Sequence, residues 1–428
     1  MLNGAGKAVI PSAARDLDHG EPSPPRPRSL ASLGMTMVVS LLLASNAAQA
    51  QQRLLDVRAL SSGVVAEQWN FSNPTPAGGA ASVVSASQFT VPVTAVLPLV
   101  SSWTLDAYVA YAHGAVTVDR GGTVGRQQLS LSGVNDAKLR LVGKLYGDNV
   151  LVTLGASLPS GTTALAPSAL EALSVLSAPA LRFRTPTLGS GPSGTGGLVL
   201  AGQSGAWSFA AGGAYEKRSN YAPSEALTAG LGRPALNSGD AVHLSVGADR
   251  VVETSRQSLS LIADIYTTGQ LDDPAAAVSL VNFRLGPTVT GTYQVQATIN
   301  NVESMLYVVE RFRSNYSVGG TTVDESWRME SEIGLVNSVL LSPQAALRVG
   351  VDSRFHTAPF SNTTQTVASF ATSGILAGGA TVGLQYSMSG GSFMVEPFVR
   401  GQIGQLDLGG PTRRATGASA GLTLTARF

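Results

Sequence analysis

Apolar and polar residues alternate with a period of two along many short segments of this chain. Near the C-terminus, Ala418, Leu422 and Leu424 fall on one face, whereas Ser419 and Thr423 fall on the other. Successive side chains of a β-strand point to opposite faces, and strands buried on both faces show continuous apolar runs instead. The pattern therefore predicts an all-β protein whose strands have one apolar and one polar face. The same alternation recurs at 242–249, 259–266, 292–299, 347–352 and 380–388.

The connections between these segments alternate in length. Short turns are expected near residues 101–102, 147–149, 202–205, 251–256, 300–302, 342–344 and 390–391. Longer stretches rich in Gly, Ser, Pro or Asn lie between them, at 73–83, 118–134, 159–193, 217–238, 270–287, 314–325, 356–376 and 405–413. Tight turns at one end and long loops at the other are typical of transmembrane β-barrels. We therefore predict an antiparallel barrel of about sixteen strands, with a range of roughly 14–18 and both termini at the short-turn end.

An amphipathic strand of roughly ten residues suits a bilayer, because lipid contacts the outside of a transmembrane barrel and water contacts the inside. A soluble β-sandwich can also end on such a strand, so the alternation alone leaves both classes open. The chain ends on Phe428. A closing strand that ends on phenylalanine resembles the C-terminal signature of bacterial outer-membrane β-barrels. This resemblance implies an outer-membrane location, contact with outer-membrane lipid, and insertion by the barrel-assembly machinery through the C-terminal strand.

Residues 1–50 have the order of a leader with a secretory signal peptide. Basic residues at Arg26 and Arg28 precede an apolar run at 35–44, and Ala48-Gln49-Ala50 follows it. A basic region, a short apolar region and a small-x-small site are the parts of such a peptide. We expect cleavage after Ala50, with translation starting at Met1 or at Met35, and an uncleaved membrane anchor is the alternative. Residues 51–428 then form a single barrel, because no change in composition marks a domain boundary.

Composition excludes several classes of function. The chain has no cysteine, so it has no disulfide framework and no thiolate metal site. Its 28 basic and 27 acidic residues are balanced, which predicts no nucleic-acid partner. His113, His243 and His356 show no metal-ligand spacing, and no nucleotide-binding or nucleophile motif occurs in a suitable context. We therefore expect no cofactor and no enzyme activity, although His113 near the outer end of a strand leaves a lipase or protease as a remote alternative.

The alternation places most charged side chains on the inside of the barrel. A charge on the lipid face would cost about 2–4 kcal/mol at mid-membrane, which favours the inward assignment. These charges have two interpretations: they orient polar or ionic solutes in the lumen, or they pair with one another and brace the wall. The expected inward residues are Asp136, Lys138, Arg140, Lys144, Arg328, Glu330, Glu332, Arg348, Asp352, Arg354, Glu396, Arg400 and Arg427.

The long loop at 159–193 is the strongest candidate for a functional element. It contains Pro167, followed by leucines at 170, 173 and 176, and this spacing predicts a short helix with an apolar stripe. Arg182, Phe183 and Arg184 come next. We predict that this tip forms a constriction that selects solutes, facing inward charges on the wall. A loop that packs against neighbouring loops or another subunit is the alternative.

Two resemblances bear on transport. The loop follows the fifth expected strand, a position that resembles the loop that folds inward and narrows the channel in general porins. The segment LGASLPSGTTAL, at 154–165, is similar to segments of outer-membrane proteins for hydrophobic compounds, of the phenol meta-pathway and long-chain fatty-acid transporter types. The second resemblance implies uptake of small apolar or aromatic molecules.

Together these observations predict a porin-like channel for passive diffusion of small solutes. A transporter for small hydrophobic or aromatic compounds is one alternative, and a structural or surface-interaction barrel with a closed lumen is another. Both a monomer and a homotrimer fit the sequence, because trimer contacts would use the same apolar outer band as lipid.

Overall fold

The computed structural model describes residues 58–72, 82–100, 102–146, 149–178, 181–185, 187–225, 232–274, 280–324, 326–357, 374–407 and 413–428. The predicted leader and its cleavage site lie outside the described residues, and so do 73–80 and 358–373, the central parts of two predicted loops. No described helix has the length and apolarity needed to cross a bilayer.

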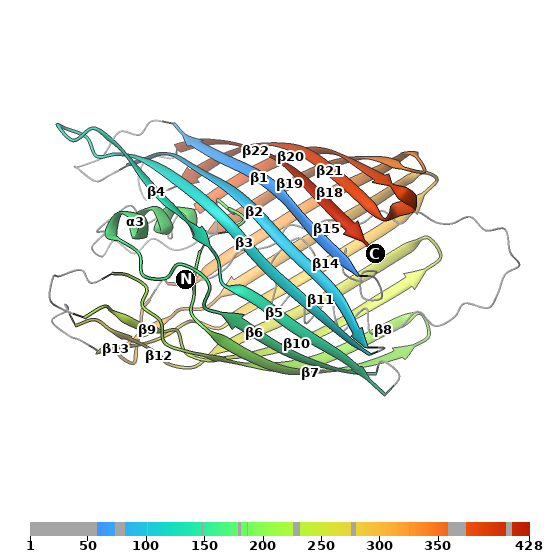
Figure 1. The fold of residues 1–428 in the computed structure, drawn as a ribbon, viewed down its shortest axis with the longest axis horizontal. Coiled ribbons are helices and arrows are strands. Elements are labelled where there is room, and N and C mark those ends of the chain that lie inside the picture. Colours follow the sequence, from blue (N-terminus) through green and yellow to red (C-terminus); the bar gives the residue numbers. More distant parts are fainter. Residues whose placement is uncertain are drawn as a thin grey trace, which may run out of the picture.

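One large antiparallel sheet forms the molecule and closes on itself, because β1 pairs with both β2 and β22 (Figure 1). Strands β4 and β5 pair with successive parts of β3, so they count as one interrupted strand of the wall. The predicted barrel of about sixteen strands is confirmed, since sixteen strands close it. The wall consists of β1 (Ala59–Phe71), β2 (Ser82–Val100), β3 (Trp103–Asp119), β4 (Arg126–Val134), β5 (Ala137–Leu145), β6 (Val150–Leu158), β7 (Ser193–Ser204), β8 (Trp207–Arg218), β10 (Ala241–Val252), β11 (Ser255–Tyr266), β14 (Thr288–Ile299), β15 (Val302–Arg313), β18 (Arg328–Ser342), β19 (Ala345–Thr357), β20 (Gly374–Met388), β21 (Phe393–Asp407) and β22 (Arg413–Arg427).

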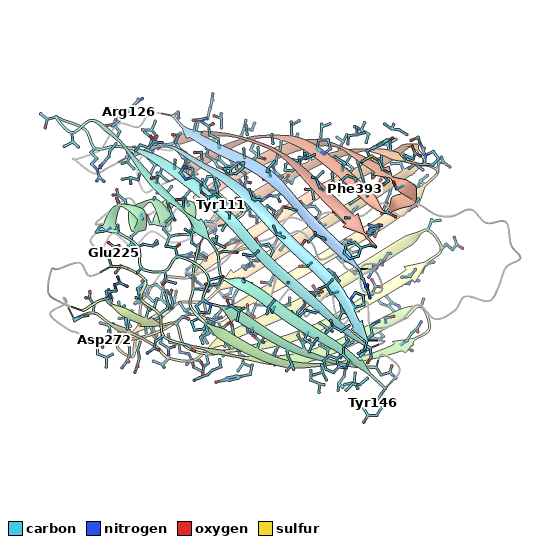
Figure 2. The ribbon with its side chains drawn as sticks, viewed as in Figure 1. Tyr111, Arg126, Tyr146, Glu225, Asp272 and Phe393 are labelled. Atoms are coloured by element: carbon cyan, nitrogen blue, oxygen red, sulfur yellow. The ribbon has the colours of Figure 1, made fainter. Side chains whose placement is uncertain are left out.

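Where the structure describes them, the predicted short turns lie at one end of the barrel, between consecutive strands of the wall. Tyr146, beside one of these turns, lies at the end opposite to Arg126 and Asp272 (Figure 2). At the long-loop end, short strands form a second sheet that continues past the barrel (Figure 1). These are β9 (Ala235–Asn237), β12 (Gly269–Asp272), β13 (Leu280–Arg284), β16 (Ser317–Val318) and β17 (Thr321–Thr322). The end with the long connections therefore carries structure beyond the membrane-spanning wall.

The two faces of the wall have the predicted polarity. On the outside, Leu244, Leu261 and Val399 are 47, 46 and 60 % exposed, whereas the inward His243 and Arg400 are buried. In a bilayer core every backbone polar group must be bonded within the protein, and a closed barrel achieves this because it has no edge. A closed barrel with an apolar exterior is the architecture of bacterial outer-membrane proteins, and the predicted outer-membrane location follows from it.

The expected loop at 118–134 is wrong, because most of it is strand β4. In β4 the polarity is inverted: Leu129 and Leu131 point inward and are buried, whereas Gln128 and Ser130 are exposed outside. Residues 135 and 136 separate β4 from β5. The residues that point inward have odd numbers in β4 and even numbers in β5. This inversion fits a strand that stands in water beyond the lipid and packs its apolar side on the loop helix inside.

A substitution pair on β11 tests the membrane-facing surface. Leu261 points outward near the middle of the strand, and its neighbour Ser260 points inward. We expect Leu261→Arg to lower the free energy of unfolding by about 2–4 kcal/mol, because a charge at mid-membrane contacts hydrocarbon. Ser260→Arg is the matched control and should have a much smaller effect. Reversible urea unfolding from lipid vesicles measures both, and equal losses would contradict the lipid-facing assignment.

Candidate functional site

The connection between β6 and β7 folds into the barrel rather than away from it, and its helix α3 (Pro167–Leu176) lies at the long-loop end, beside β4 (Figure 1). The predicted helix is confirmed. Pro167 occupies its first turn, where the missing N–H leaves no bond unmade. Leu176 is fully buried and lies directly over Gly114 of β3, where an added Cβ would collide with it. The glycine therefore permits the close approach of helix to wall.

An apolar cluster fixes α3 in this position. The wall contributes Trp69, Phe71, Val83, Val116, Leu129, Ile375 and Leu406, among others, and the loop contributes Leu165, Ala172, Val175, Leu176, Leu181, Phe183 and Leu188. All of these side chains are less than a tenth exposed. Burial of a large apolar side chain contributes roughly 1.5–3 kcal/mol, so a cluster of this size holds the loop strongly inside the barrel.

Hydrogen bonds attach the loop to the wall at its base. The carboxylate of Asp136, at the break between β4 and β5, accepts from the N–H of Gly161 at 2.9 Å and from the N–H of Ser190 at 2.6 Å. The Ser190 hydroxyl donates to the same carboxylate at 3.2 Å. Asp136 is 2 % exposed. One inward carboxylate thus holds the two ends of the loop together.

Further hydrogen bonds attach the segment that follows the helix to β1 and β2. The indole N–H of Trp69 donates to the carbonyl of Leu181 at 3.1 Å. Gln88 and Thr185 bond twice, from the amide Nε2 to the Thr185 carbonyl at 2.7 Å and from the Thr185 N–H back to Oε1 at 2.9 Å. The sequence pattern does not identify Trp69 or Gln88 as residues that contact the loop. The alternation places both side chains on the inner face of the barrel, but it does not predict that they contact a loop.

The tip of the loop crosses to another part of the wall. Arg182, with φ +53°, forms an ion pair with Glu332 of β18. Four wall strands, β19 to β22, separate β18 from β1, where the loop backbone is held. Burial lowers the pKa of Arg182, and the Glu330 carboxylate opposes that shift. The tip therefore bridges two separate parts of the barrel interior through a buried guanidinium.

The other two residues of the predicted tip lie in different surroundings. Phe183 is 2 % exposed within the apolar cluster, so it packs the loop against the wall. The backbone N–H of Arg184 donates to Glu67 of β1 at 3.0 Å. Its guanidinium carbon lies 5.6 Å from the centre of the Phe398 ring of β21. The structure brings Arg182 and Arg184 to the charged wall and directs Phe183 away from it.

Several predicted wall residues form rows across β20. Arg348 of β19 pairs with Glu396 of β21. Asp352 of β19 accepts from Arg400 of β21 at 2.7 Å. These contacts are made over the middle strand because its inward residues opposite Arg348 and Asp352 are glycines. At one of them, Gly379, an added Cβ would lie 2.7 Å from Nη2 of Arg400.

A third row joins Arg354 of β19 to Gln402 of β21, with Nη2 donating to Oε1 at 3.1 Å. Next to these rows, on β18, Arg328 and Glu330 share the inner face, and Glu330 pairs with Arg311 at 3.1 Å. On the other side of the barrel, Asp106 pairs with Arg140. Seven of the thirteen predicted inward residues therefore belong to ion pairs of the described part of the chain, whereas Asp136 bonds to backbone N–H groups and Arg354 to a neutral amide.

The three histidines lie in separate surroundings in the described part of the chain. His113 is exposed on the outer face of β3. His243 lies inside, 2.8 Å from Asp264 and 3.5 Å from Glu216, and His356 lies 3.8 Å from Glu330. No group of three or more potential metal ligands occurs among the described residues. At the C-terminus, Phe428 is 68 % exposed, and its N–H donates to the carbonyl of Arg58 at 3.0 Å.

No family model matches the sequence, and no curated protein matches it. Solved structures of outer-membrane proteins do match the fold. A FadL homologue from Pseudomonas aeruginosa has a TM-score of 0.42 and 9 % identity, covering 86 % of this chain and 90 % of that one. OmpT, an outer membrane protein of Vibrio cholerae, has a TM-score of 0.38 and 10 % identity, covering 86 % of this chain and 97 % of that one. The outer membrane protein OpdK from Pseudomonas aeruginosa has a TM-score of 0.39 and 11 % identity, covering 87 % of this chain and 100 % of that one. The likeness is confined to the barrel architecture.

Proposed function

We propose that this protein is an outer-membrane channel through which small solutes diffuse passively, and that the loop at 159–193 narrows it. The observation that supports this most is the path of the loop tip. It is held to β1 by Trp69 and Glu67 and reaches β18 through the pair of Arg182 with Glu332. A barrel of about sixteen strands has an interior wide enough for an aqueous channel, so an inserted loop sets its narrowest part.

The charged wall gives this channel its selectivity. Arg182 and Arg184 of the tip face Arg348, Asp352 and Arg354 and their neighbours Arg328, Glu330, Glu396 and Arg400. Charges of both signs in a confined lumen orient polar or ionic solutes as they pass. The C-terminal strand, ending on Phe428, would carry the signal for the barrel-assembly machinery, and the assembled protein would work as a monomer or homotrimer in outer-membrane lipid.

Planar-bilayer recording of the refolded protein tests this function. We expect steady single-channel current, because the proposed path is lined with polar side chains and water would fill it. The control is a bilayer that has received the same detergent and lipid without protein. A correctly folded barrel, checked by its resistance to unfolding in cold SDS, that never conducts would contradict the channel and favour a closed barrel.

A route for apolar compounds is the second candidate function, and the part of the wall formed by β4 favours it. Strand β4 pairs with β3, and its other edge faces the loop, where the N–H of Thr162 donates to the Val134 carbonyl at 3.3 Å. Behind this edge lies the apolar cluster with Leu129 and Leu131. Movement of the loop would expose an apolar path through the wall. A barrel without current that still takes a labelled aromatic hydrocarbon into proteoliposomes would favour this candidate over the first.

A further inference from the structure

Three arginines approach the inner face of β21 at successive inward positions. The guanidinium of Arg184 lies over Phe398, Arg400 is the next inward residue, and Arg354 bonds to Gln402, the one after that. Inward residues of a strand are about 7 Å apart, so the three arginines reach neighbouring points along the inner face of β21.

Arg182 of the loop tip is a fourth member of this group. It pairs with Glu332, and Glu332 lies directly opposite Arg354 in the register of β18 and β19. We refer to Arg182, Arg184, Arg354 and Arg400 as the arginine cluster.

The carboxylates near the arginine cluster do not balance its charge. Arg182 pairs with Glu332, and Arg400 pairs with Asp352. Neither Arg184 nor Arg354 belongs to any ion pair of the described residues. Like charges held together in a confined space repel one another, and an anion between them removes that repulsion. Glu67 is the third nearby carboxylate, since it accepts from the Arg184 N–H and its charge acts on Arg354. The four guanidinium groups therefore carry one positive charge more than Glu332, Asp352 and Glu67 supply.

Unused hydrogen-bond donors point to the same conclusion. Arg354 is 4 % exposed, and its Nε has no acceptor in the structure. The Nε groups of Arg184 and Arg400 also lack acceptors. A buried donor without a partner lowers stability by about 1–3 kcal/mol, and by more when the group is charged. Donors from three arginines left unused in one region suggest a ligand that accepts from them.

Aromatic rings hold two of these guanidinium groups in position. Arg184 lies 5.6 Å from the Phe398 ring centre, and Arg354 lies 5.3 Å from that of Trp69. A guanidinium attracted to an aromatic ring keeps its charge and its N–H donors, which can form paired bonds with a carboxylate or phosphate. The rings thus attract these two guanidinium groups without supplying an acceptor for their N–H donors.

We propose that the arginine cluster binds the oxyanion group, carboxylate or phosphate, of solutes inside the barrel. This inference rests on the proposed channel for its role in transport, because bound anions would then be the preferred cargo. The binding itself requires no current, so the two proposals can fail separately. Glu332 and Asp352 do not compete for the ligand, because Arg182 and Arg400 already engage them.

Calorimetric titration of the folded protein in detergent with inorganic phosphate, and separately with acetate, tests the site. We expect Arg354→Gln and Arg184→Gln each to weaken binding roughly tenfold, since each removes one charge-assisted donor group. Arg126→Gln is the matched control, because Arg126 is 64 % exposed on the external β3–β4 hairpin, and should leave binding unchanged. Gly379→Ala keeps the charge but displaces the Arg400 guanidinium, and should also weaken binding.

A bilayer experiment with the same proteins separates the two proposals. Under a KCl gradient, the reversal potential of the wild type should indicate a preference for chloride, and Arg184→Gln combined with Arg354→Gln should move it toward zero. Phosphate binding without current would sustain the site and overturn the channel. Current without phosphate or acetate binding, or an equal loss of binding in the Arg126→Gln control, would overturn the site and leave the channel in place.

Discussion

Deletion of residues 165–184 should raise the single-channel conductance several-fold. This segment contains α3 and the tip that reaches Glu332, and its described residues lie inside the barrel against β1, β4 and β18. Conductance increases with the cross-section of the narrowest part of a pore, and the wall of a sixteen-strand barrel encloses a far wider space than the loop leaves. Planar-bilayer recording on the deletion variant and the wild type gives the comparison directly.

The deletion needs a control for altered folding, because it exposes Trp69, Phe71 and Leu129 to the lumen. Removal of residues 121–124, at the tip of the β3–β4 hairpin, shortens another external connection without touching the apolar cluster. This control should conduct like the wild type. Equal conductance of the 165–184 deletion and the wild type, in barrels that both resist cold SDS, would show that the constriction lies elsewhere.

The wall of the barrel could be predicted from the sequence because each membrane-spanning strand repeats one simple rule. Lipid requires apolar side chains outside, so alternation assigned inner and outer faces at Leu244, Leu261 and Arg400 as the structure has them. The rule fails where the wall leaves the lipid. Leu129 and Leu131 of β4 turn inward toward α3, and polar side chains face outward. The sequence therefore predicts a loop where the structure has a strand.

The site could be predicted only in part, for a related reason. Alternation identified Arg348, Asp352 and Arg400 as inward residues, but the pairing of charges across β20 depends on register and on Gly379 beneath them. The spacing of leucines predicted α3, whereas the burial of Phe183 depends on how the loop enters the barrel. Contacts over more than a hundred residues, such as Trp69 with Leu181, leave no trace in local patterns.

The ion pair between Arg182 and Glu332 should contribute strongly to stability, and a double-mutant cycle measures it. Both side chains are less than a tenth exposed, and the Tyr307 hydroxyl also donates to Glu332 at 2.9 Å. Arg182→Gln leaves the Glu332 carboxylate buried without its counter-charge. We expect this variant to lower the free energy of unfolding by about 3–5 kcal/mol, since removal of one partner of a buried pair leaves an uncompensated charge. Urea unfolding in detergent is the measurement.

A double variant shows whether the stability lost in Arg182→Gln comes from an unpaired Glu332 carboxylate or from loss of packing at the loop tip. Arg182→Met combined with Glu332→Leu removes both charges, so most of the lost stability should return, because a buried pair is often replaceable by apolar side chains of similar size. Arg120→Gln is the control within the same loop contact: Arg120 pairs with Glu171 at 2.6 Å but is 32 % exposed, and its loss should cost no more than about 1 kcal/mol. If Arg182→Gln were as mild as Arg120→Gln, the tip would not be fixed to β18. The loop would then be held only by the apolar cluster and by its hydrogen bonds to β1 and β2.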